Sequence, residues 1–277
     1  MRLPDSTNAF YVASLRFVQS IHEAPERRNP DNLVRYFIPP LQRWKAKWLG
    51  MRRLAELRAD PFYFYLAART RHYDEVFTSA IADGVRHIVS VGCGSDTRAY
   101  RFRQLLLDHQ VRVLECDQPA ALGVKRRVAR RFNAADYVQY LAVDLNDHSW
   151  PALSSRIDRT GAKALLLLEG VSPYVNASSF TTFLGTMARQ LPPGSRIAYD
   201  YKLHGVDDDF GKTSPTAVPF RMSAVPAEVA AFHAEIGLRL ESCELSSELT
   251  ARLVPGLRES GAALFAEDGL ARLTVMT

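Results

Sequence analysis

The 277-residue sequence has few cysteines and no long apolar run. Its three cysteines, Cys93, Cys116 and Cys243, form no C-x-x-C pair, and their odd number argues against a framework of disulfides. No apolar stretch approaches the ~20 residues of a membrane span, and the first residues lack the apolar core of a signal peptide. We therefore expect a cytoplasmic protein without a membrane partner.

Metal-site and hydrolase patterns are also missing. The seven histidines are scattered and lack the spacing of zinc ligands, so we expect no bound metal. The Gly-x-Ser-x-Gly elbow of α/β-hydrolases is absent.

An excess of charge is confined to the N-terminal part. Residues 1–80 hold 13 Lys/Arg against 8 Asp/Glu, whereas the remaining chain holds 22 of each, so this part carries the whole net charge of +5. No platform of basic and aromatic residues accompanies the excess, and we expect no nucleic-acid partner. The charge fits either a solvated helical face or attraction for an acidic small molecule. The sequence indicates no oligomeric state.

The pattern of apolar residues divides the chain into an N-terminal helical part, residues 1–82, and one α/β domain, residues 83–277. Helices are predicted over 41–58, between two proline-containing turns, and over 62–82. Predicted strands cover 85–91, 111–116, 137–143, 162–168, 195–201, 238–245 and 271–277, and predicted helices cover 97–108, 119–132, 177–191 and 226–236. Their alternation predicts a doubly wound, Rossmann-like parallel sheet, and residues 202–224 are predicted to be an inserted lid loop.

A glycine-rich turn follows the first predicted strand. Gly92 and Gly94 permit a tight turn and a close approach of the backbone to a ligand. Thr97 replaces the third glycine of G-x-G-x-x-G, which disfavours a dinucleotide and hence an NAD-dependent oxidoreductase. Asp96 at the helix entry would repel an anion but tolerate a zwitterionic amino acid. A purely structural turn is the alternative interpretation.

Polar residues also end the next three predicted strands. Asp117 lies 23 residues after Gly94, close to the spacing expected of a carboxylate that binds ribose hydroxyls. Asp144 with Leu145 ends the third strand, and Glu169 ends the fourth. Each carboxylate alone could instead cap a helix or a turn. Because ligands of open α/β sheets bind at the carboxyl ends of strands, the four ends together predict a nucleoside site.

These motifs resemble the leucine carboxyl methyltransferase family, and in particular its bacterial branch linked to polyketide O-methyltransferases. The resemblance covers about residues 62–201. It rests on Arg69–Asp74, Val91–Arg101, Glu115–Pro119 with Lys125-Arg126, Val143–Leu145 and Glu169–Tyr174. The stretch from Asp96 to Arg101 is the most specific of these pieces.

The resemblance implies a class I methyltransferase sheet with an N-terminal helical extension over the substrate. It implies S-adenosyl-L-methionine (SAM) as cofactor, S-adenosyl-L-homocysteine (SAH) as product, and cofactor contacts at Arg69, Gly94, Asp117, Asp144, Leu145 and Glu169. From the glycine turn we expect Gly92 to bind the cofactor as well. Arg69 would pair with the methionine carboxylate of SAM. The family also uses a lysine nearer the N-terminus, which has no evident counterpart because residues 1–50 contain only Lys45 and Lys47.

The expected reaction is methyl transfer to an oxygen, forming the methyl ester of a small natural-product acid. A carboxylate acceptor requires no general base, because its pKa of about 4 leaves it ionised at neutral pH. Tyr174 is predicted to hydrogen-bond the acceptor oxygen, and residues 1–60 with the 202–224 loop to exclude water. The alternatives are transfer to a phenol, nitrogen or carbon, and a SAM-binding protein without catalytic activity. His72 would matter only if the methyl acceptor were a phenol that needs deprotonation, and we expect it instead to lie on the surface of a helix.

Overall fold

The computed structural model describes residues 5–147, 150–157, 161–206, 210–212, 214, 216–257 and 261–276. Helices precede the sheet, as expected: α1 (Asp5–His22), η1 (Val34–Phe37), α2 (Pro40–Ala59) and α3 (Pro61–Ala82). Proline begins both α2 and α3, where its missing N–H removes no helical hydrogen bond. The Asp60 carboxylate caps α3 by accepting from the backbone N–H of Phe62 at 3.0 Å.

The sheet has the strand order β3-β2-β1-β4-β5-β8-β7, and β6 pairs with β5 off this path. Its strands are β1 (His87–Val91), β2 (Arg112–Asp117), β3 (Val138–Ala142), β4 (Ala164–Leu168), β5 (Arg196–Leu203), β6 (Arg221–Met222), β7 (Leu238–Leu245) and β8 (Asp268–Val275). This order is typical of class I Rossmann-like methyltransferases and confirms the predicted fold. The sheet is mixed, not wholly parallel, because β8 runs antiparallel to both β5 and β7.

The two faces of the sheet belong to two separate apolar cores. Leu165 and Leu167 of β4 point into a core shared with α3, whereas Leu166 and Leu168 point into a core shared with the helix that follows β4. This alternation follows from the pleat of a strand. Since β4 is buried along its whole length, its continuous apolar run is that of a central strand covered on both sides.

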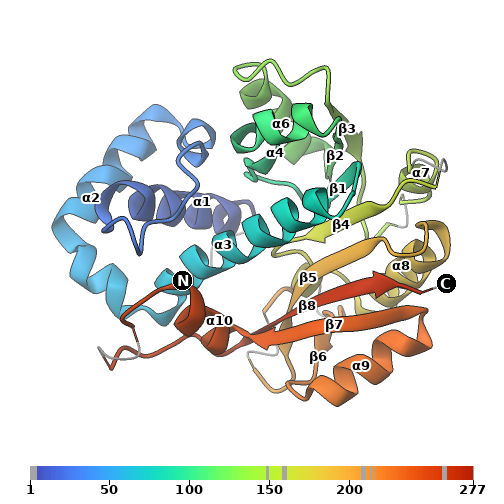
Figure 1. Cartoon of the computed structure of the whole chain (residues 1–277). Helices are drawn as coiled ribbons and strands as arrows, with labels where there is room; N and C mark the ends of the chain where they lie inside the picture. Colours follow the sequence, from blue (N-terminus) through green and yellow to red (C-terminus); the bar gives the residue numbers. More distant parts are fainter. Residues whose placement is uncertain are drawn as a thin grey trace.

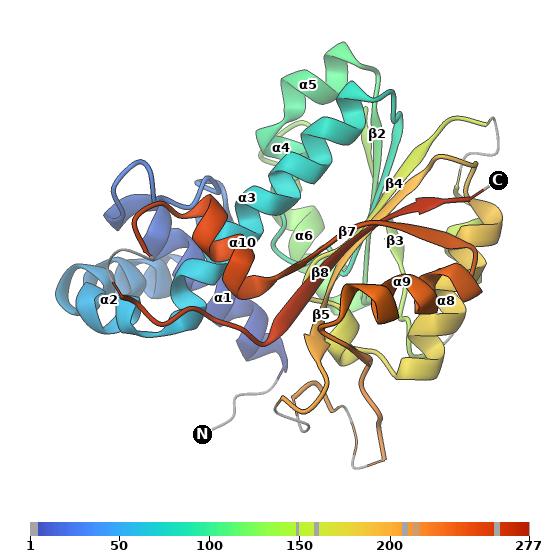
Figure 2. The same cartoon turned by 60° about the horizontal axis from the view of Figure 1, so that its bottom comes forward.

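The remaining helices are α4 (Arg98–Arg101), α5 (Arg103–Asp108), α6 (Pro119–Ala129), α7 (Pro151–Ser154), η2 (Ser172–Tyr174), α8 (Ala177–Gln190), α9 (Pro226–Glu235) and α10 (Ser246–Leu253). The predicted helix over 97–108 is two short helices, interrupted at Phe102. The sequence did not predict α10, which packs against α3. Figures 1 and 2 show α2 at the periphery, with α1 and α3 between it and the sheet.

The predicted lid loop begins later than expected, because β5 continues to Leu203, and it contains β6 near its end. Its aspartates at 207–209 lie outside the described residues. The last strand begins at Asp268, three residues before its predicted start, and residue 277 is also outside the described part. None of the helices in the described ranges combines the length and apolar character that crossing a membrane would need.

Candidate functional site

The glycine turn lies between β1 and α4. Gly92 has φ +66°, and a Cβ there would come within 2.3 Å of Cγ2 of Val171, so only glycine fits. Gly94 has φ +35°, and a Cβ on it would meet only the carbonyl oxygen of Gly92, at 3.8 Å. The backbone of Gly94 therefore borders open space, as a loop that contacts a ligand must.

Asp117 binds this turn directly. Its Oδ2 accepts from the backbone N–H of Gly94 at 2.7 Å, and its Oδ1 accepts from the N–H of Gln118 at 2.8 Å. Burial raises the pKa of Asp117, and these two hydrogen bonds oppose the rise. The carboxylate is thus held in one orientation at the end of β2. It lies beside the glycine turn, as its spacing from Gly94 in the sequence predicted.

The end of β3 is joined to this pair. The side-chain amide of Gln118 donates to Oδ2 of Asp144 at 2.8 Å, and the backbone N–H of Asn146 donates to Oδ1 of the same carboxylate at 2.9 Å. Leu145 is buried in the apolar core that also contains Leu166 and Leu168 of β4. The structure therefore brings the predicted residues of β1, β2 and β3 together; their roles as cofactor ligands stay predictions.

Asn146 also joins β3 to the segment after β4. Its amide nitrogen donates to the carbonyl oxygen of Tyr174 at 2.9 Å, and its amide oxygen accepts from the N–H of Asn176 at 2.9 Å. The ring of Tyr174 lies beside Phe210, with 5.6 Å between the centroids. Tyr174 is thus fixed through its backbone in the short helix η2, next to the predicted lid loop.

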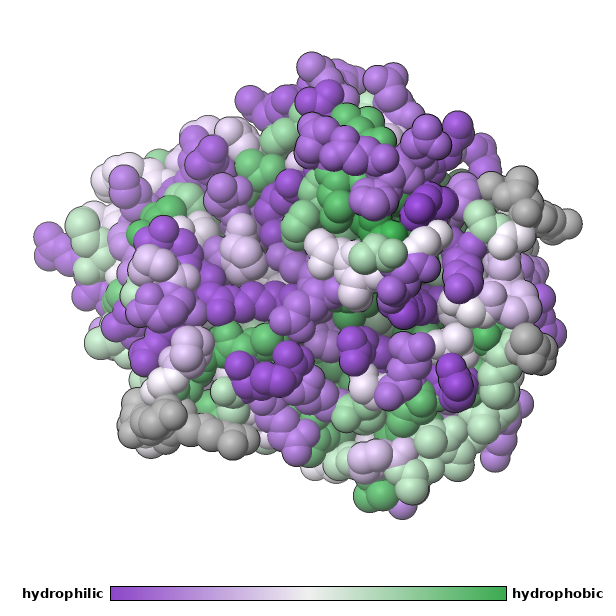
Figure 3. All heavy atoms as spheres, in the orientation of Figure 1, coloured by the Kyte–Doolittle hydropathy of each residue, from purple (hydrophilic) through white to green (hydrophobic). Residues whose placement is uncertain are grey.

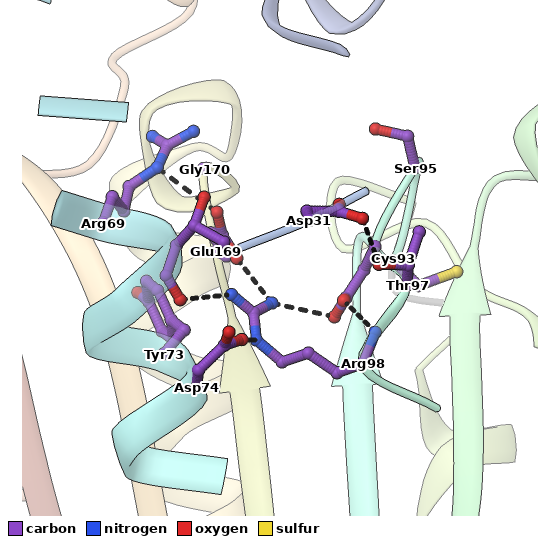
Figure 4. A network of polar contacts seen from close by, with 12 residues as sticks. Asp31, Arg69, Tyr73, Asp74, Cys93, Ser95, Thr97, Arg98, Glu169 and Gly170 are labelled. Carbon is purple, nitrogen blue, oxygen red and sulfur yellow. Dashed lines mark hydrogen bonds and ion pairs between the residues drawn. The ribbon is translucent and has the colours of Figure 1, made fainter. Parts of the chain in front are cut away.

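Glu169 belongs to a buried network of charges centred on Arg98. Nη1 of Arg98 lies 2.7 Å from Oε2 of Glu169 and 3.1 Å from Oδ2 of Asp96, and Nε lies 2.9 Å from Oδ1 of Asp74. Figure 4 shows the Arg98 side chain pointing between Asp74 and Glu169. Burial alone would raise the pKa of Glu169, but the charges of Arg98 and Arg69 outweigh it and hold the pKa below its usual value.

Arg69 reaches the same network from α3. Its Nε lies 3.3 Å from Oε1 of Glu169, and its Nη1 donates to Oδ2 of Asp200 at 3.1 Å. The other oxygen of Asp200 accepts from the N–H of Gly170 at 2.6 Å and from the hydroxyl of Tyr73 at 3.2 Å. Within the described part of the chain, Nε of Arg69 is buried and makes no hydrogen bond. The contact of Nε with Glu169 is therefore an ion pair without hydrogen-bond geometry.

The N-terminal helices contact the glycine turn through a second group of polar residues. Asp31 is fully buried and accepts from the hydroxyl of Thr97 at 2.6 Å. Arg16 of α1 pairs with Asp31, and its Nη1 lies 3.4 Å from Oγ of Ser95. A basic residue of the N-terminal part, Arg16, thus lies at the glycine turn.

Sequence reasoning missed most members of these two networks. Arg98 lay inside the motif that carried the resemblance but received no role, and Asp200 lay inside a predicted strand. Asp200 could have been found by the rule that had identified Glu169, because it also lies toward the carboxyl end of a parallel strand. No signal in the sequence marked Asp31, and Arg16 was only one of several N-terminal arginines that could attract an acidic substrate.

The expectation for His72 was wrong. Its side chain is buried, and this burial, together with the charge of Arg272, lowers its pKa to about 4. Its other charged neighbours are Glu244 of β7, Arg252 of α10 and Arg98 of α4. Helical periodicity alone could not reveal that C-terminal elements cover this side of α3.

Known proteins were compared with this chain. A family model for leucine carboxyl methyltransferase matches residues 9–188. A protein of Mycobacterium ulcerans with the provisional name S-adenosyl-L-methionine-dependent methyltransferase is 33% identical over 147 residues, which are 52% of this chain and 46% of the relative. A Rhodococcus jostii protein of the same provisional name is 30% identical over 209 residues, 72% of this chain and 66% of the relative.

The chain spans about half the length of several of these curated relatives. Among solved structures, an O-methyltransferase family protein from Burkholderia thailandensis matches with a TM-score of 0.47 and 12% identity, covering 98% of this chain and 84% of the other. A magnesium protoporphyrin IX methyltransferase from Synechocystis, solved with SAH, matches with a TM-score of 0.48 and 11% identity, covering 81% and 94%.

Proposed function

This chain belongs to the leucine carboxyl methyltransferase family, and we propose that it transfers a methyl group from SAM to a carboxylate oxygen of a small organic acid. The observation that carries the proposal is the row of contacts from Gly94 through Asp117 and Gln118 to Asp144. This row joins the ends of three neighbouring parallel strands, where ligands of such sheets bind. A nucleoside would lie along it.

The residues of the site fit the parts of SAM. Each carboxylate oxygen of Asp117 accepts one backbone N–H and retains capacity for a further bond, so both can accept ribose hydroxyls. Asp144 with Leu145 would receive the adenine. The Arg69 guanidinium would bind the methionine carboxylate, and Glu169 would accept from the ammonium group. Gly92 and Gly94 keep the turn open for this approach.

When bound, SAM supplies an electrophilic methyl group on a positively charged sulfur. The chain itself would orient the acceptor, and good orientation can contribute roughly 7–11 kcal/mol to lowering a barrier. We assign Tyr174 to hydrogen-bond the acceptor oxygen. We further assign residues 1–82 to cover the acceptor and the 202–224 loop of the 83–277 domain to exclude water. The contact of Asp31 with Thr97 supports this cover, because it ties the N-terminal part to the glycine turn.

The surroundings of His72 support a carboxylate over a phenol. A phenol must lose a proton during transfer, and His72 was the histidine considered for that task. Burial and the charge of Arg272 lower the pKa of His72 to about 4, which makes it a weak base for this task. A carboxylate is already ionised at neutral pH and needs no base. We propose natural-product acids of the polyketide type as acceptors, because the motifs resemble that bacterial branch of the family.

Calorimetric titration with SAH tests the cofactor site. Asp117→Ala should weaken SAH binding by ~1–3 kcal/mol, because buried hydrogen bonds to the ribose are lost. Asp136→Ala, at an exposed position outside the site, is the matched control and should bind SAH like the wild type. An unchanged affinity of Asp117→Ala would remove the ribose role, and binding of NAD without SAH would point to an oxidoreductase instead.

Labelled-methyl transfer to a panel of acids, phenols and amines tests the acceptor. A methyl ester releases methanol in mild base, whereas an aryl ether or a methylated nitrogen or carbon does not. We expect base-labile label on an acid, and a fall in kcat for Tyr174→Phe. A base-stable label would show that the accepting atom does not belong to a carboxylate. If the protein binds SAH but transfers no methyl group to any acceptor, we would conclude that it is a SAM-binding protein without catalytic activity.

A further inference from the structure

Four large apolar side chains form a stripe on the outer surface of α2. Leu41, Trp44, Trp48 and Met51 follow one another at intervals of three and four residues, which places them on one side of a helix. Their exposed fractions are 62%, 63%, 45% and 64%. Single exposed apolar residues are common on protein surfaces, but four in a row make a continuous patch that marks an interaction site.

The opposite side of α2 is the side that packs on the protein. Gly50 is buried, and a Cβ on it would lie 2.7 Å from side-chain atoms of Val18 and His22 in α1. His22 also contacts the carbonyl oxygen of Lys47 at 3.0 Å. Figures 1 and 2 show α1 and α3 between α2 and the sheet, and the exposed stripe lies on another side of α2 than Gly50, which packs on α1. Contact with the methyl acceptor therefore does not explain the stripe.

Basic residues surround the stripe. Glu56 is the single acidic residue in α2, and the basic residues of this helix are Arg43, Lys45, Lys47, Arg52, Arg53 and Arg58. Lys45, Lys47 and Arg52 form no ion pair with any residue that the structure describes, and the Arg52 guanidinium lies 5.1 Å from the ring centroid of Trp48. Figure 3 shows hydrophilic and hydrophobic surface side by side over the part of the molecule where α2 lies.

This charge decides between the possible partners of the stripe. A second copy of the chain, paired through the same stripe, would bring two strongly basic helices together, and their repulsion disfavours that dimer. An anionic surface is complementary. Tryptophan on an exposed apolar face flanked by Lys and Arg is the composition of helices that lie in the headgroup region of a membrane.

We propose that α2 docks this protein on a membrane surface rich in anionic phospholipids. The apolar stripe enters the headgroup region, and Lys45, Lys47 and Arg52 contact the lipid phosphates. From the sequence we expected no membrane partner, because no apolar run is long enough to span a membrane, but peripheral docking requires no such run. The proposal is independent of the methyl acceptor.

Co-sedimentation of the full chain with vesicles tests the apolar half of the proposal. We expect binding to vesicles of phosphatidylcholine mixed with phosphatidylglycerol, with a blue shift of tryptophan fluorescence, and much weaker binding to phosphatidylcholine alone. Trp44→Ser/Trp48→Ser should weaken binding about tenfold or more, because the inserted area is lost. Leu107→Ser is the matched control, since Leu107 is exposed on α5, and it should bind like the wild type.

A second pair of variants tests the charged half. Lys45→Glu/Lys47→Glu should abolish binding to the anionic vesicles. Arg127→Glu/Arg130→Glu alters the net charge of the protein equally but changes exposed residues in or next to α6, so it should retain most of the binding. High salt should weaken wild-type binding. Circular dichroism and thermal melting verify that all variants are folded.

Three outcomes would overturn the proposal. The first is a wild-type protein that does not bind the anionic vesicles. The second is equal binding by the wild type and Trp44→Ser/Trp48→Ser. The third is a concentration-dependent dimer in sedimentation equilibrium that Trp44→Ser/Trp48→Ser abolishes while vesicle binding is absent, which would assign the stripe to a second copy.

Discussion

Consecutive helices of similar length, α2 and α3, have opposite relations to the rest of the protein. Of the 22 residues of α3, 14 are buried, whereas Gly50 is the only buried residue among the 20 of α2. Both helices begin with proline and both carry arginines. Helix-forming signals therefore predicted both helices equally well, and the difference between them comes from tertiary packing.

The two helices also differ in the partners of their charged side chains. In α3, Arg69 and Asp74 each meet opposite charges from distant segments, at Glu169 and Arg98, and so connect the helix to the strand ends. In α2, the ion pair of Arg53 with Glu56 is local and exposed. Buried pairs hold the candidate site in place. In α2, Arg58 pairs with Glu23, whereas Lys45, Lys47 and Arg52 form no ion pair among the described residues and remain available to a partner outside the chain.

Arg98→Met should have the largest effect. It leaves the carboxylates of Asp74, Asp96 and Glu169 in a buried place without their shared cation, and removal of one partner from a buried ion pair costs about 3–5 kcal/mol. The measurement is the free energy of unfolding in urea. Arg52→Met in α2 is the control, because Arg52 forms no ion pair among the described residues. Equal stability of the two variants would contradict the contrast between the helices.

Gly92→Ala should rank second. The left-handed backbone at Gly92 costs an alanine roughly 1–2 kcal/mol, and the clash with Val171 adds about 1–3 kcal/mol of overpacking. Gly50→Ala in α2 also creates close contacts, but with side chains of α1 and without a left-handed backbone. We therefore expect a smaller loss there. Urea unfolding compares the two, and Val171→Ala should restore part of the loss in Gly92→Ala only.

His72 makes the stability of the α3 region depend on pH. Its pKa of about 4 in the folded protein lies below the usual 6.5, so below pH 6.5 the unfolded chain binds a proton that the folded protein does not. The free energy of unfolding therefore falls as pH drops from about 6.5 towards 4, by about 2 kcal/mol between pH 7 and pH 5 from this residue.

Urea unfolding at both pH values, in the wild type and in His72→Gln, checks this dependence. The variant should lose less stability on acidification. His233, in α9, also has a pKa lowered to about 4 by burial, and its contribution should remain in His72→Gln. An identical pH dependence of the wild type and the variant would mean that His72 is accessible to water and protons in the folded state.

Local sequence patterns predicted those features of the fold and the site that depend on residues close together in the sequence. Asp117 could be predicted as a site residue because a glycine turn, a strand and a carboxylate follow one another at a known spacing. Arg98 and Asp200 were missed because their roles depend on partners up to 131 residues away. The burial of His72 depends on α10 and the C-terminal strands, which no pattern within α3 indicates.

Met51→Ser should have the smallest effect, and it tests the α2 side of the comparison. Met51 is 64% exposed, and substitutions at such surface positions usually change stability by less than about 0.5 kcal/mol. Phe77→Ala in α3 is the counterpart, because Phe77 is 2% exposed and a loss of about 3–5 kcal/mol is expected there. Urea unfolding measures both. A large loss in Met51→Ser would mean that the stripe of α2 packs within the protein in solution, and the helix could then not present it to a partner.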